Sequence, residues 1–182
     1  MFTGTQIPDS EIERIYRQIL KQQENIVLIG MPGVGKSTIG RRLAEATGKT
    51  FLDADQVFTE KYGISPAEVI TNRGEAEMRF METEVMRELG MKSSTVIATG
   101  GGVITRAENY KLMHQNGTIV WLRRDLSGLS LEGRPLSKRA GVQELFAVRK
   151  PLYEKFCDVQ VSMEATPDKT TAKILKLLAE RE

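Results

Sequence analysis

A glycine-rich segment from Gly30 to Thr38 has the residue types needed to hold a phosphate group. It reads GMPGVGKST and fits the pattern G-x-x-x-x-G-K-[ST] in full. Glycines let the backbone turn so that successive N–H groups point at phosphate oxygens. A lysine adds a full positive charge and a serine hydroxyl is suited to Mg²⁺. We expect nucleotide phosphates to be bound by this loop and the start of the next helix, at Gly33, Val34, Gly35, Lys36, Ser37 and Thr38.

The flanks of this segment agree with a phosphate-binding loop. Residues 26–29 read IVLI, an apolar run of strand length that is rich in β-branched residues. After the loop, Ile39, Leu43 and Ala46 recur at helical spacing. The start of a helix also carries partial positive charge, which favours anions. The alternative is a glycine-rich turn that carries lysine and serine by chance, but the strand and helix on either side favour phosphate binding.

Two acidic residues, Asp53 and Asp55, lie at the end of the next strand-like segment, which reads TFLD over residues 50–53. At positions i and i+2 of an extended chain they point the same way. One could hold the water shell of Mg²⁺ while the other reaches an acceptor hydroxyl. The alternative is a pair of surface acids where a strand becomes a helix, with Asp55 as the N-cap. The spacing alone does not decide between these interpretations.

Three glycines, 100–102, directly follow the buried strand pattern TVIA, which indicates close approach of some group to the backbone. A tight turn without a ligand is the alternative.

Arg79 and Arg149 lie in helix patterns, and an arginine fork matches a carboxylate or phosphate in two parallel hydrogen bonds. Arg134 lies in a loop-like segment that could cover the phosphates. Taken alone, Arg79 and Arg149 each fit a solvated surface position better than a binding site, and the alternative for the Arg134 loop is an ordinary connection between helices.

The elements that would position these residues alternate between strand and helix from residue 26 onward. This pattern predicts an α/β fold, a doubly wound parallel sheet flanked by helices. In such sheets ligands lie beyond the carboxyl ends of the strands, where all of the motifs above fall. Strands are predicted at 26–30, 50–53, 95–98, 118–122 and 158–162, and helices at 36–47, 55–62, 66–71, 74–89, 106–115, 141–156 and 168–180.

An amphipathic helix precedes the first core strand. Residues 10–13 (SEIE) resemble a capping box, and four apolar residues then recur on one helical face: Ile12, Ile15, Tyr16 and Ile19. We therefore divide the chain into an N-terminal helical extension, 1–24, and a main domain, 25–182. We expect the helix to pack against that domain, and a contact with a partner or a second copy is the alternative.

The composition is typical of a soluble globular chain. Of 182 residues, 40% are hydrophobic and 27% charged, and the net charge of +2 gives no support for a nucleic-acid or membrane partner. No apolar run approaches the roughly 20 residues that cross a bilayer, and no secretion signal is evident. The single cysteine, Cys157, excludes an internal disulfide and fits a reducing compartment. We expect a cytoplasmic monomer.

Taken together, the motifs resemble those of the shikimate kinase family over about residues 25–180. A phosphate-binding loop is shared by many kinases, but six motifs in this order and spacing are specific. They are the loop at 30–38, FLDAD at 51–55, the helix with Glu75 and Arg79, TGGG at 99–102, GRPL at 133–136 and RKPLY at 149–153.

The resemblance implies a five-stranded parallel sheet similar to that of nucleoside monophosphate kinases, with a substrate-binding helical region and a lid at about 124–140. It implies transfer of the ATP γ-phosphoryl group to the 3-hydroxyl of shikimate, with Mg²⁺, in aromatic amino acid biosynthesis. For the nucleotide, the resemblance implies that Lys36 binds the β- and γ-phosphates and that Arg134 contacts ATP from the lid. For Mg²⁺, it implies a direct contact from Ser37 and a contact through water from Asp53. For the acceptor, it implies that Asp55 binds the hydroxyls and removes the proton, that Arg79 and Arg149 clamp the carboxylate, and that the backbone of Gly101 contacts the substrate.

The sequence departs from the family pattern in its short lid and in Met78, which stands beside the clamp arginine where phenylalanine is usual. Methionine fills apolar space adaptably, so that replacement should be mild. Two other functions compete with the implied one. The first is a related kinase for gluconate or a nucleoside monophosphate, against which the triple glycine and RKPLY argue. The second is a nucleotide-binding regulatory module without catalysis, which the short lid suggests and the intact Lys36 and Asp55 oppose.

Overall fold

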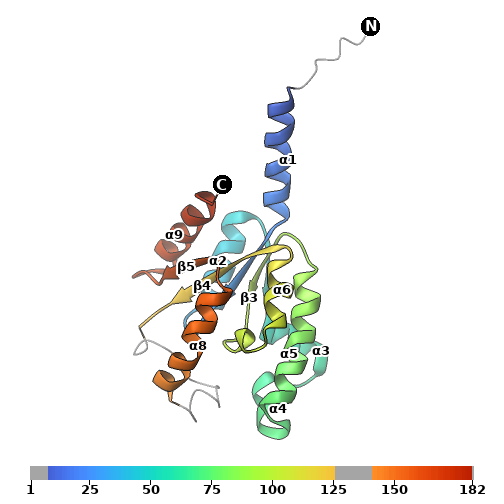
Figure 1. Ribbon diagram of the computed structural model, residues 1–182, viewed down its shortest axis with the longest axis vertical. Coiled ribbons are helices and arrows are strands. Elements are labelled where there is room, and N and C mark those ends of the chain that lie inside the picture. Colours follow the sequence, from blue (N-terminus) through green and yellow to red (C-terminus); the bar gives the residue numbers. More distant parts are fainter. Residues whose placement is uncertain (1–7, 126–140, 182) are drawn as a thin grey trace.

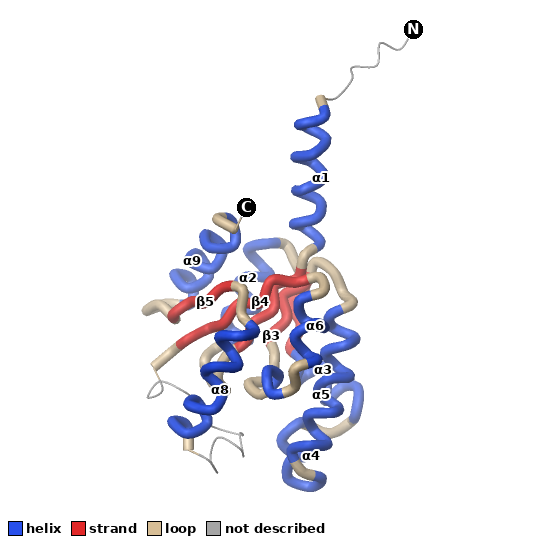
Figure 2. Tube along the Cα trace, viewed as in Figure 1, coloured by secondary structure: helices blue, strands red, loops and turns tan. Residues whose placement is uncertain are grey.

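The computed structural model describes residues 8–125 and 141–181. Its centre is a five-stranded, all-parallel sheet with the order β2-β3-β1-β4-β5 (Figures 1 and 2). This confirms the predicted α/β fold, and each strand lies within one residue of its expected range. The strands are β1 (Asn25–Ile29), β2 (Thr50–Asp53), β3 (Thr95–Ala98), β4 (Gly117–Arg123) and β5 (Val159–Ser162).

Helices connect the strands and cover both faces of the sheet (Figure 2). The predicted helices are all present, and a short 3₁₀ helix, η1 (Val103–Thr105), follows the triple glycine, where no element was expected. The α-helices are α1 (Asp9–Gln23), α2 (Lys36–Thr47), α3 (Ala54–Tyr62), α4 (Pro66–Arg73), α5 (Glu75–Gly90), α6 (Glu108–His114), α8 (Val142–Phe156) and α9 (Pro167–Ala179).

Alternate residues of the strands point to opposite faces of the sheet, which separates two apolar cores. On one face Val27 and Ile29 belong to a large cluster that includes residues of α3, α4, α5, α6 and α8. On the other face Ile26 and Leu28 pack with residues of α2 and α9. Because the central strands are buried on both sides, their sequences are continuously apolar, as is typical of parallel sheets.

Residues at their N-terminal ends determine where helices α2 and α4 begin. α2 begins directly after Gly35, whose φ of 107° is a left-handed conformation that favours glycine. α4 begins with a capping box between Ser65 and Glu68, with Pro66 in its first turn. The short helices α3 and α4, together with the longer α5, form the helical region beside β2 and β3 (Figure 1).

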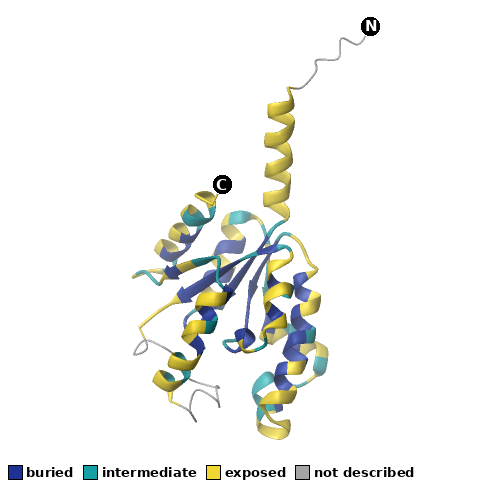
Figure 3. Ribbon diagram, viewed as in Figure 1, coloured by how far each residue is buried: buried dark blue, intermediate teal, exposed yellow. Residues whose placement is uncertain are grey.

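Helix α1 differs from its prediction in two ways. It begins at Asp9 after Pro8 with no side-chain cap, so the capping box expected at 10–13 is wrong. All of its residues are exposed, and the helix projects away from the sheet (Figure 3). The expectation that it packs on the main domain is therefore also wrong. Within residues 8–125 and 141–181, no helix combines the length and apolar character needed to cross a membrane.

Candidate active site

The segment after β1 forms the predicted phosphate-binding loop. Lys36 is buried, and its Nζ donates to the carbonyl oxygens of Gly30 at 2.8 Å and Met31 at 3.1 Å. The ammonium group is thereby held over the loop in which phosphate would lie. The side chain of Val34 is buried in the core under α2, so only its backbone can face a ligand.

The two aspartates after β2 take different positions. Asp53 ends the strand and is the N-cap of α3, accepting a hydrogen bond from the backbone N–H of Asp55 at 3.1 Å. Asp55 lies in the first turn of α3, so neither its assignment as the N-cap nor the extended geometry between the pair is correct. The other Asp53 oxygen accepts from the Ser37 hydroxyl at 2.6 Å. This contact brings together the two residues predicted to lie near Mg²⁺.

A cavity of about 380 Å³ lies between the phosphate-binding loop and the carboxyl ends of β2 and β3. It therefore lies where ligands bind in open parallel sheets. Its lining contains nearly all of the predicted nucleotide and metal residues together with Asp55 and Gly101. The lining residues are Pro32, Gly33, Gly35, Lys36, Ser37, Thr38, Asp53, Asp55, Thr99, Gly100 and Gly101.

The triple glycine after β3 makes the close approaches that its composition predicts. A Cβ on Gly101 would lie 2.7 Å from two ring carbons of Pro32, in the phosphate-binding loop. A Cβ on Gly102 would lie 2.0 Å from a guanidinium nitrogen of Arg79. The groups that need this space are thus parts of the protein itself, and the glycines let the loop after β3 lie between α5 and the phosphate-binding loop.

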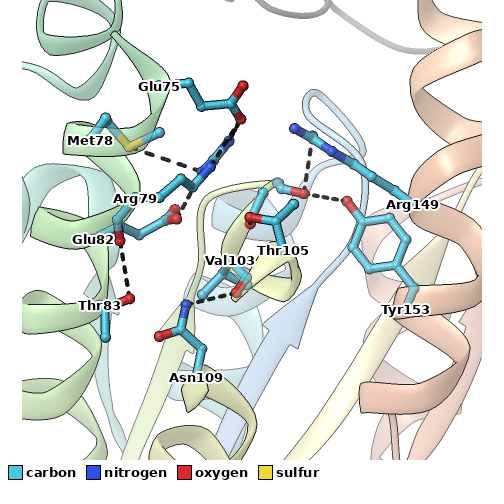
Figure 4. Close-up of polar contacts among 12 residues, drawn as sticks. Glu75, Met78, Arg79, Glu82, Thr83, Val103, Thr105, Asn109, Arg149 and Tyr153 are labelled. Atoms are coloured by element: carbon cyan, nitrogen blue, oxygen red, sulfur yellow. Dashed lines mark hydrogen bonds and ion pairs between the residues drawn. The ribbon is translucent and has the colours of Figure 1, made fainter. Parts of the chain in front are cut away.

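Arg79 is fixed in its position by two acids from its own helix (Figure 4). Its guanidinium contacts Glu82 at 2.8 Å and Glu75 at 3.1 Å; Glu82 is buried and Glu75 is exposed. Burial lowers the pKa of Arg79, but the two carboxylates outweigh it and raise the pKa, so the cation is secure. Burial raises the pKa of Glu82, with the charge of Asp55 acting in the same direction and Arg79 opposing it.

Arg149 approaches the same glycine loop from α8 (Figure 4). Its guanidinium donates to the carbonyl oxygen of Gly101 at 3.2 Å, and the hydroxyl of Tyr153 donates to the same oxygen at 2.5 Å. Burial lowers the pKa of Arg149, and the nearby positive charge of Arg79 lowers it further. Two arginines far apart in sequence therefore lie close enough to influence each other, at one loop.

The structure thus brings together most of the predicted site residues. Arg134, with most of the predicted lid, lies outside the described residues. Met78 is buried, and its sulfur contacts the guanidinium of Arg79 at 4.0 Å. That contact agrees with the expectation that methionine is accommodated there.

Two residues of this site were not predicted. Glu82 follows Arg79 by three positions, so the two share a helix face, and its neighbours Met81 and Val85 are buried. In the sequence, the signal that could have identified Glu82 is an acidic residue among the apolar residues of this helix. Tyr153 follows Arg149 by four positions within the motif RKPLY. Its spacing predicted a shared face, but its bond to Gly101 depends on the tertiary fold.

Comparison with known proteins identifies relatives in sequence and in structure. The family model for shikimate kinase matches residues 32–179. A shikimate kinase from Chromobacterium violaceum is 38% identical over 144 residues, which are 74% of this chain and 78% of the relative. The structure of shikimate kinase from Acinetobacter baumannii in complex with shikimate superposes with a TM-score of 0.83 at 31% identity, covering 91% of this chain and 98% of the other. A gluconokinase from Sinorhizobium meliloti, with a TM-score of 0.56 and 21% identity, covers 87% and 93% and shares the fold alone.

Proposed function

Because the chain belongs to the shikimate kinase family, we propose that it transfers the γ-phosphoryl group of ATP to the 3-hydroxyl of shikimate. The hydroxyl oxygen forms a bond to the γ-phosphorus, and the bond from that phosphorus to the bridging oxygen of ADP breaks. The hydroxyl proton passes to a base, and the products are shikimate 3-phosphate and ADP. The reaction serves aromatic amino acid biosynthesis, and we place it in the cytoplasm, whose reducing conditions suit the unpaired Cys157.

The nucleotide is assigned to the loop at residues 30–38. Its backbone N–H groups and the start of α2 would bind the phosphates of ATP, and Lys36 would contact the outer two. The order of the motifs and the cavity beneath them support this assignment. In the short lid at about 124–140, Arg134 is proposed to neutralise charge on the transferring group.

The donor set at Ser37 and Asp53 fits Mg²⁺. A hydroxyl and a carboxylate 2.6 Å apart are hard oxygen ligands, and Mg²⁺ commonly uses one or two protein oxygens besides phosphate and water. No cluster of three or more His, Cys, Asp or Glu within the described ranges offers a site built from protein ligands alone. When bound, the ion would offset negative charge on the phosphates. Ser37 would hold it directly and Asp53 through water.

The acceptor is assigned to the other end of the cavity. We assign proton removal to Asp55, which lines the cavity. We assign the carboxylate of shikimate to Arg79 and Arg149, which lie against the glycine loop that borders the cavity. The observation that carries this assignment is the position of Gly101. It lines the phosphate cavity, and its carbonyl also accepts the hydrogen bond from Arg149. One loop therefore connects the phosphate end of the site to the arginines, so a small anionic polyol can reach both.

The test is ADP release measured with a panel of acceptors: shikimate, quinate, gluconate and common nucleoside monophosphates. We expect ADP release that depends on shikimate, with the new phosphate monoester at C3 shown by phosphorus NMR. Release that depends on gluconate or a nucleotide instead would replace the proposal by a related kinase activity. Saturable ATP binding without turnover on any acceptor would identify a regulatory module.

A further inference from the structure

Asn109, in the first turn of α6, is a fully buried polar residue that bonds to the segment after the triple glycine (Figure 4). Its Nδ2 donates to the carbonyl oxygen of Val103, the first residue of η1, at 2.7 Å. The orientation of the amide follows from this contact, because a carbonyl can only accept and therefore faces the nitrogen. Asn109 thus connects α6 to the segment that continues the glycine loop.

The oxygen of the same amide lowers stability. Within the described ranges, Oδ1 of Asn109 is the only buried side-chain nitrogen or oxygen atom without a hydrogen-bond partner. Burial of an unpartnered acceptor is unfavourable, and an apolar side chain of similar size would avoid it. Met113, one turn further along the same face of α6, is such an apolar residue and belongs to the core. The packing of α6 alone therefore does not explain an asparagine at this position, whereas the bond to Val103 does.

Hydrogen bonds within the glycine loop set its shape. The backbone N–H of Val103 donates to the carbonyl oxygen of Gly100 at 3.3 Å. The backbone N–H and the hydroxyl of Thr105 donate to that of Gly102 at 2.9 Å and 2.7 Å. Each of these bonds joins residues three positions apart, so none of them connects the loop to another element. They close the turn from the triple glycine into η1, but they do not determine where that turn lies.

Side chains of two other helices hold this turn in place. From α8, Arg149 and Tyr153 donate to the carbonyl oxygen of Gly101. From α6, Asn109 donates to that of Val103. Asn109 lies outside the lining of the active-site cavity, whereas Gly101 is part of that lining. An effect of Asn109 on a ligand in the cavity must therefore pass through the loop.

Helix α6 can support the loop because it packs closely on α5. A Cβ on Gly90, at the end of α5, would lie 2.1 Å from the carbonyl oxygen of Leu112 in α6, so only glycine permits this approach. α5 also carries Arg79, whose guanidinium lies against Gly102. The two helices and the glycine loop therefore contact one another in turn, and Asn109 supplies the hydrogen bond from α6 to the loop.

We propose that Asn109 is a positioning residue for the acceptor, an inference that rests on the proposed function. By holding Val103, it keeps the glycine loop where Gly101 can contact shikimate and accept the bond from Arg149. Asn109 itself touches neither the substrate nor the nucleotide. Its replacement should therefore weaken shikimate binding more than it changes ATP binding or turnover.

The first experiment measures steady-state kinetics and urea unfolding of Asn109→Leu, in which the side chain keeps a similar size but cannot donate. The KM for shikimate should rise about two- to tenfold, the range expected for one lost hydrogen bond. The KM for ATP and kcat should stay within about twofold of the wild type, because the donor lies outside the cavity. Asn109→Ala also lacks the donor and gives the same comparison if the leucine variant does not fold. An unchanged KM for shikimate in a folded variant overturns the proposal.

Asn25→Leu is the matched control. Asn25 is also buried, and its Nδ2 donates to a backbone carbonyl, that of Lys92, at 2.6 Å. It begins β1, at the amino end of the strand, whereas the active-site cavity lies at the carboxyl ends. The control should lower the free energy of unfolding at least as much as Asn109→Leu, because Oδ1 of Asn25 also accepts from Thr95, but it should not change the KM for shikimate. An equal rise in that KM in both variants would show that it follows stability, and would overturn the proposal.

Hydrogen exchange reports on the loop without catalysis, so it separates a failure of this inference from a failure of the proposed function. In Asn109→Leu, the amides of residues 100–105 should exchange faster than in the wild type, while those of β3 keep their rates. Unchanged exchange over residues 100–105 overturns the proposal even where the wild type phosphorylates shikimate. If the wild type does not phosphorylate shikimate, the proposed function fails, and faster exchange over the same residues still supports the restraint of the loop by Asn109.

Discussion

The hydroxyl of Tyr153 donates a hydrogen bond of 2.5 Å to the carbonyl oxygen of Gly101. Tyr153 is fully buried, and its ring stacks on Trp121 in β4 with centroids 5.5 Å apart. Burial raises its pKa, so the hydroxyl remains a donor throughout the physiological range. The core of the domain therefore holds in place the glycine loop that lines the active-site cavity.

We predict that Tyr153→Phe weakens shikimate binding and lowers the free energy of unfolding by about 0.5–1.5 kcal/mol, the usual worth of one hydrogen bond. The ring contact with Trp121 is retained, so the effect reports the lost hydroxyl. Urea unfolding and the KM for shikimate measure the two changes. Tyr110→Phe, a partly exposed position on α6, is the control. An unchanged KM would show that Arg149 alone suffices to hold Gly101.

Asp55→Asn should reduce kcat by a factor on the order of 10²–10⁴, the usual contribution of a general base, while ATP binding survives. The amide keeps the size of the side chain but cannot take a proton. Steady-state turnover and ATP titration separate the two effects, and Glu60→Gln, exposed on the same helix, is the control. Turnover like that of the wild type would remove Asp55 from the mechanism.

Ser37→Ala should raise the Mg²⁺ concentration needed for half-maximal activity, and Ser37→Thr should restore it, because threonine supplies the same hydroxyl. Chelation of divalent ions should abolish turnover in both the wild type and the threonine variant. Activity measured against Mg²⁺ concentration tests this. The same Mg²⁺ dependence in the alanine variant and the wild type would assign the metal to other oxygens.

Most of the fold could be predicted because its signals are local. Alternating strand and helix patterns, with glycines after β1 and β3, were enough for the sheet and its functional edge. The exception is α1, whose amphipathic pattern predicts packing within the chain, whereas the structure leaves the helix exposed. Periodicity reports that a face is apolar, but it contains nothing about which surface covers it.

The site was predictable as a set of residues and less so as a geometry. The phosphate-binding loop has a fixed local form, so Lys36 and Ser37 could be placed from their motif. The pairing of Arg79 with Glu82 follows from helical spacing, but the burial that makes the pair important depends on α5 packing against the sheet. That packing, like the contact of Gly101 with Tyr153, joins segments distant in sequence, and spacing alone cannot show it.

Arg79→Ala and Arg149→Ala should each weaken shikimate binding by about 2–5 kcal/mol, because removing one partner of a desolvated charge pair carries that cost. The affinity for ATP should change much less. Lysine at either position keeps the charge but loses the planar fork, so it should recover only part of the binding. Calorimetric titration with shikimate measures the effect, with Arg87→Ala on the exposed side of α5 as control. Unchanged affinity in both alanine variants would disprove the clamp.

The buried carboxyl of Glu82 should leave a signature in the pH dependence of stability. Its pKa is raised in the folded protein by burial and by Asp55, against the opposing effect of Arg79. At a pH just above the ordinary value of 4.5, the folded state therefore retains a proton that the unfolded chain has lost. Folded molecules then bind more protons than unfolded ones, so this group makes the free energy of unfolding fall as pH rises from about 4.5 to the raised pKa.

Glutamine at position 82 cannot titrate, so Glu82→Gln should remove this contribution. The free energy of unfolding of the wild type minus that of the variant should decrease with rising pH in this window and then level off. Urea unfolding at a series of pH values tests the difference. Glu75→Gln removes the exposed partner of Arg79 but leaves Glu82 in place, so it should keep the wild-type slope. A wild-type advantage that grows with pH would mean that Arg79 stabilises the Glu82 carboxylate by more than its burial costs.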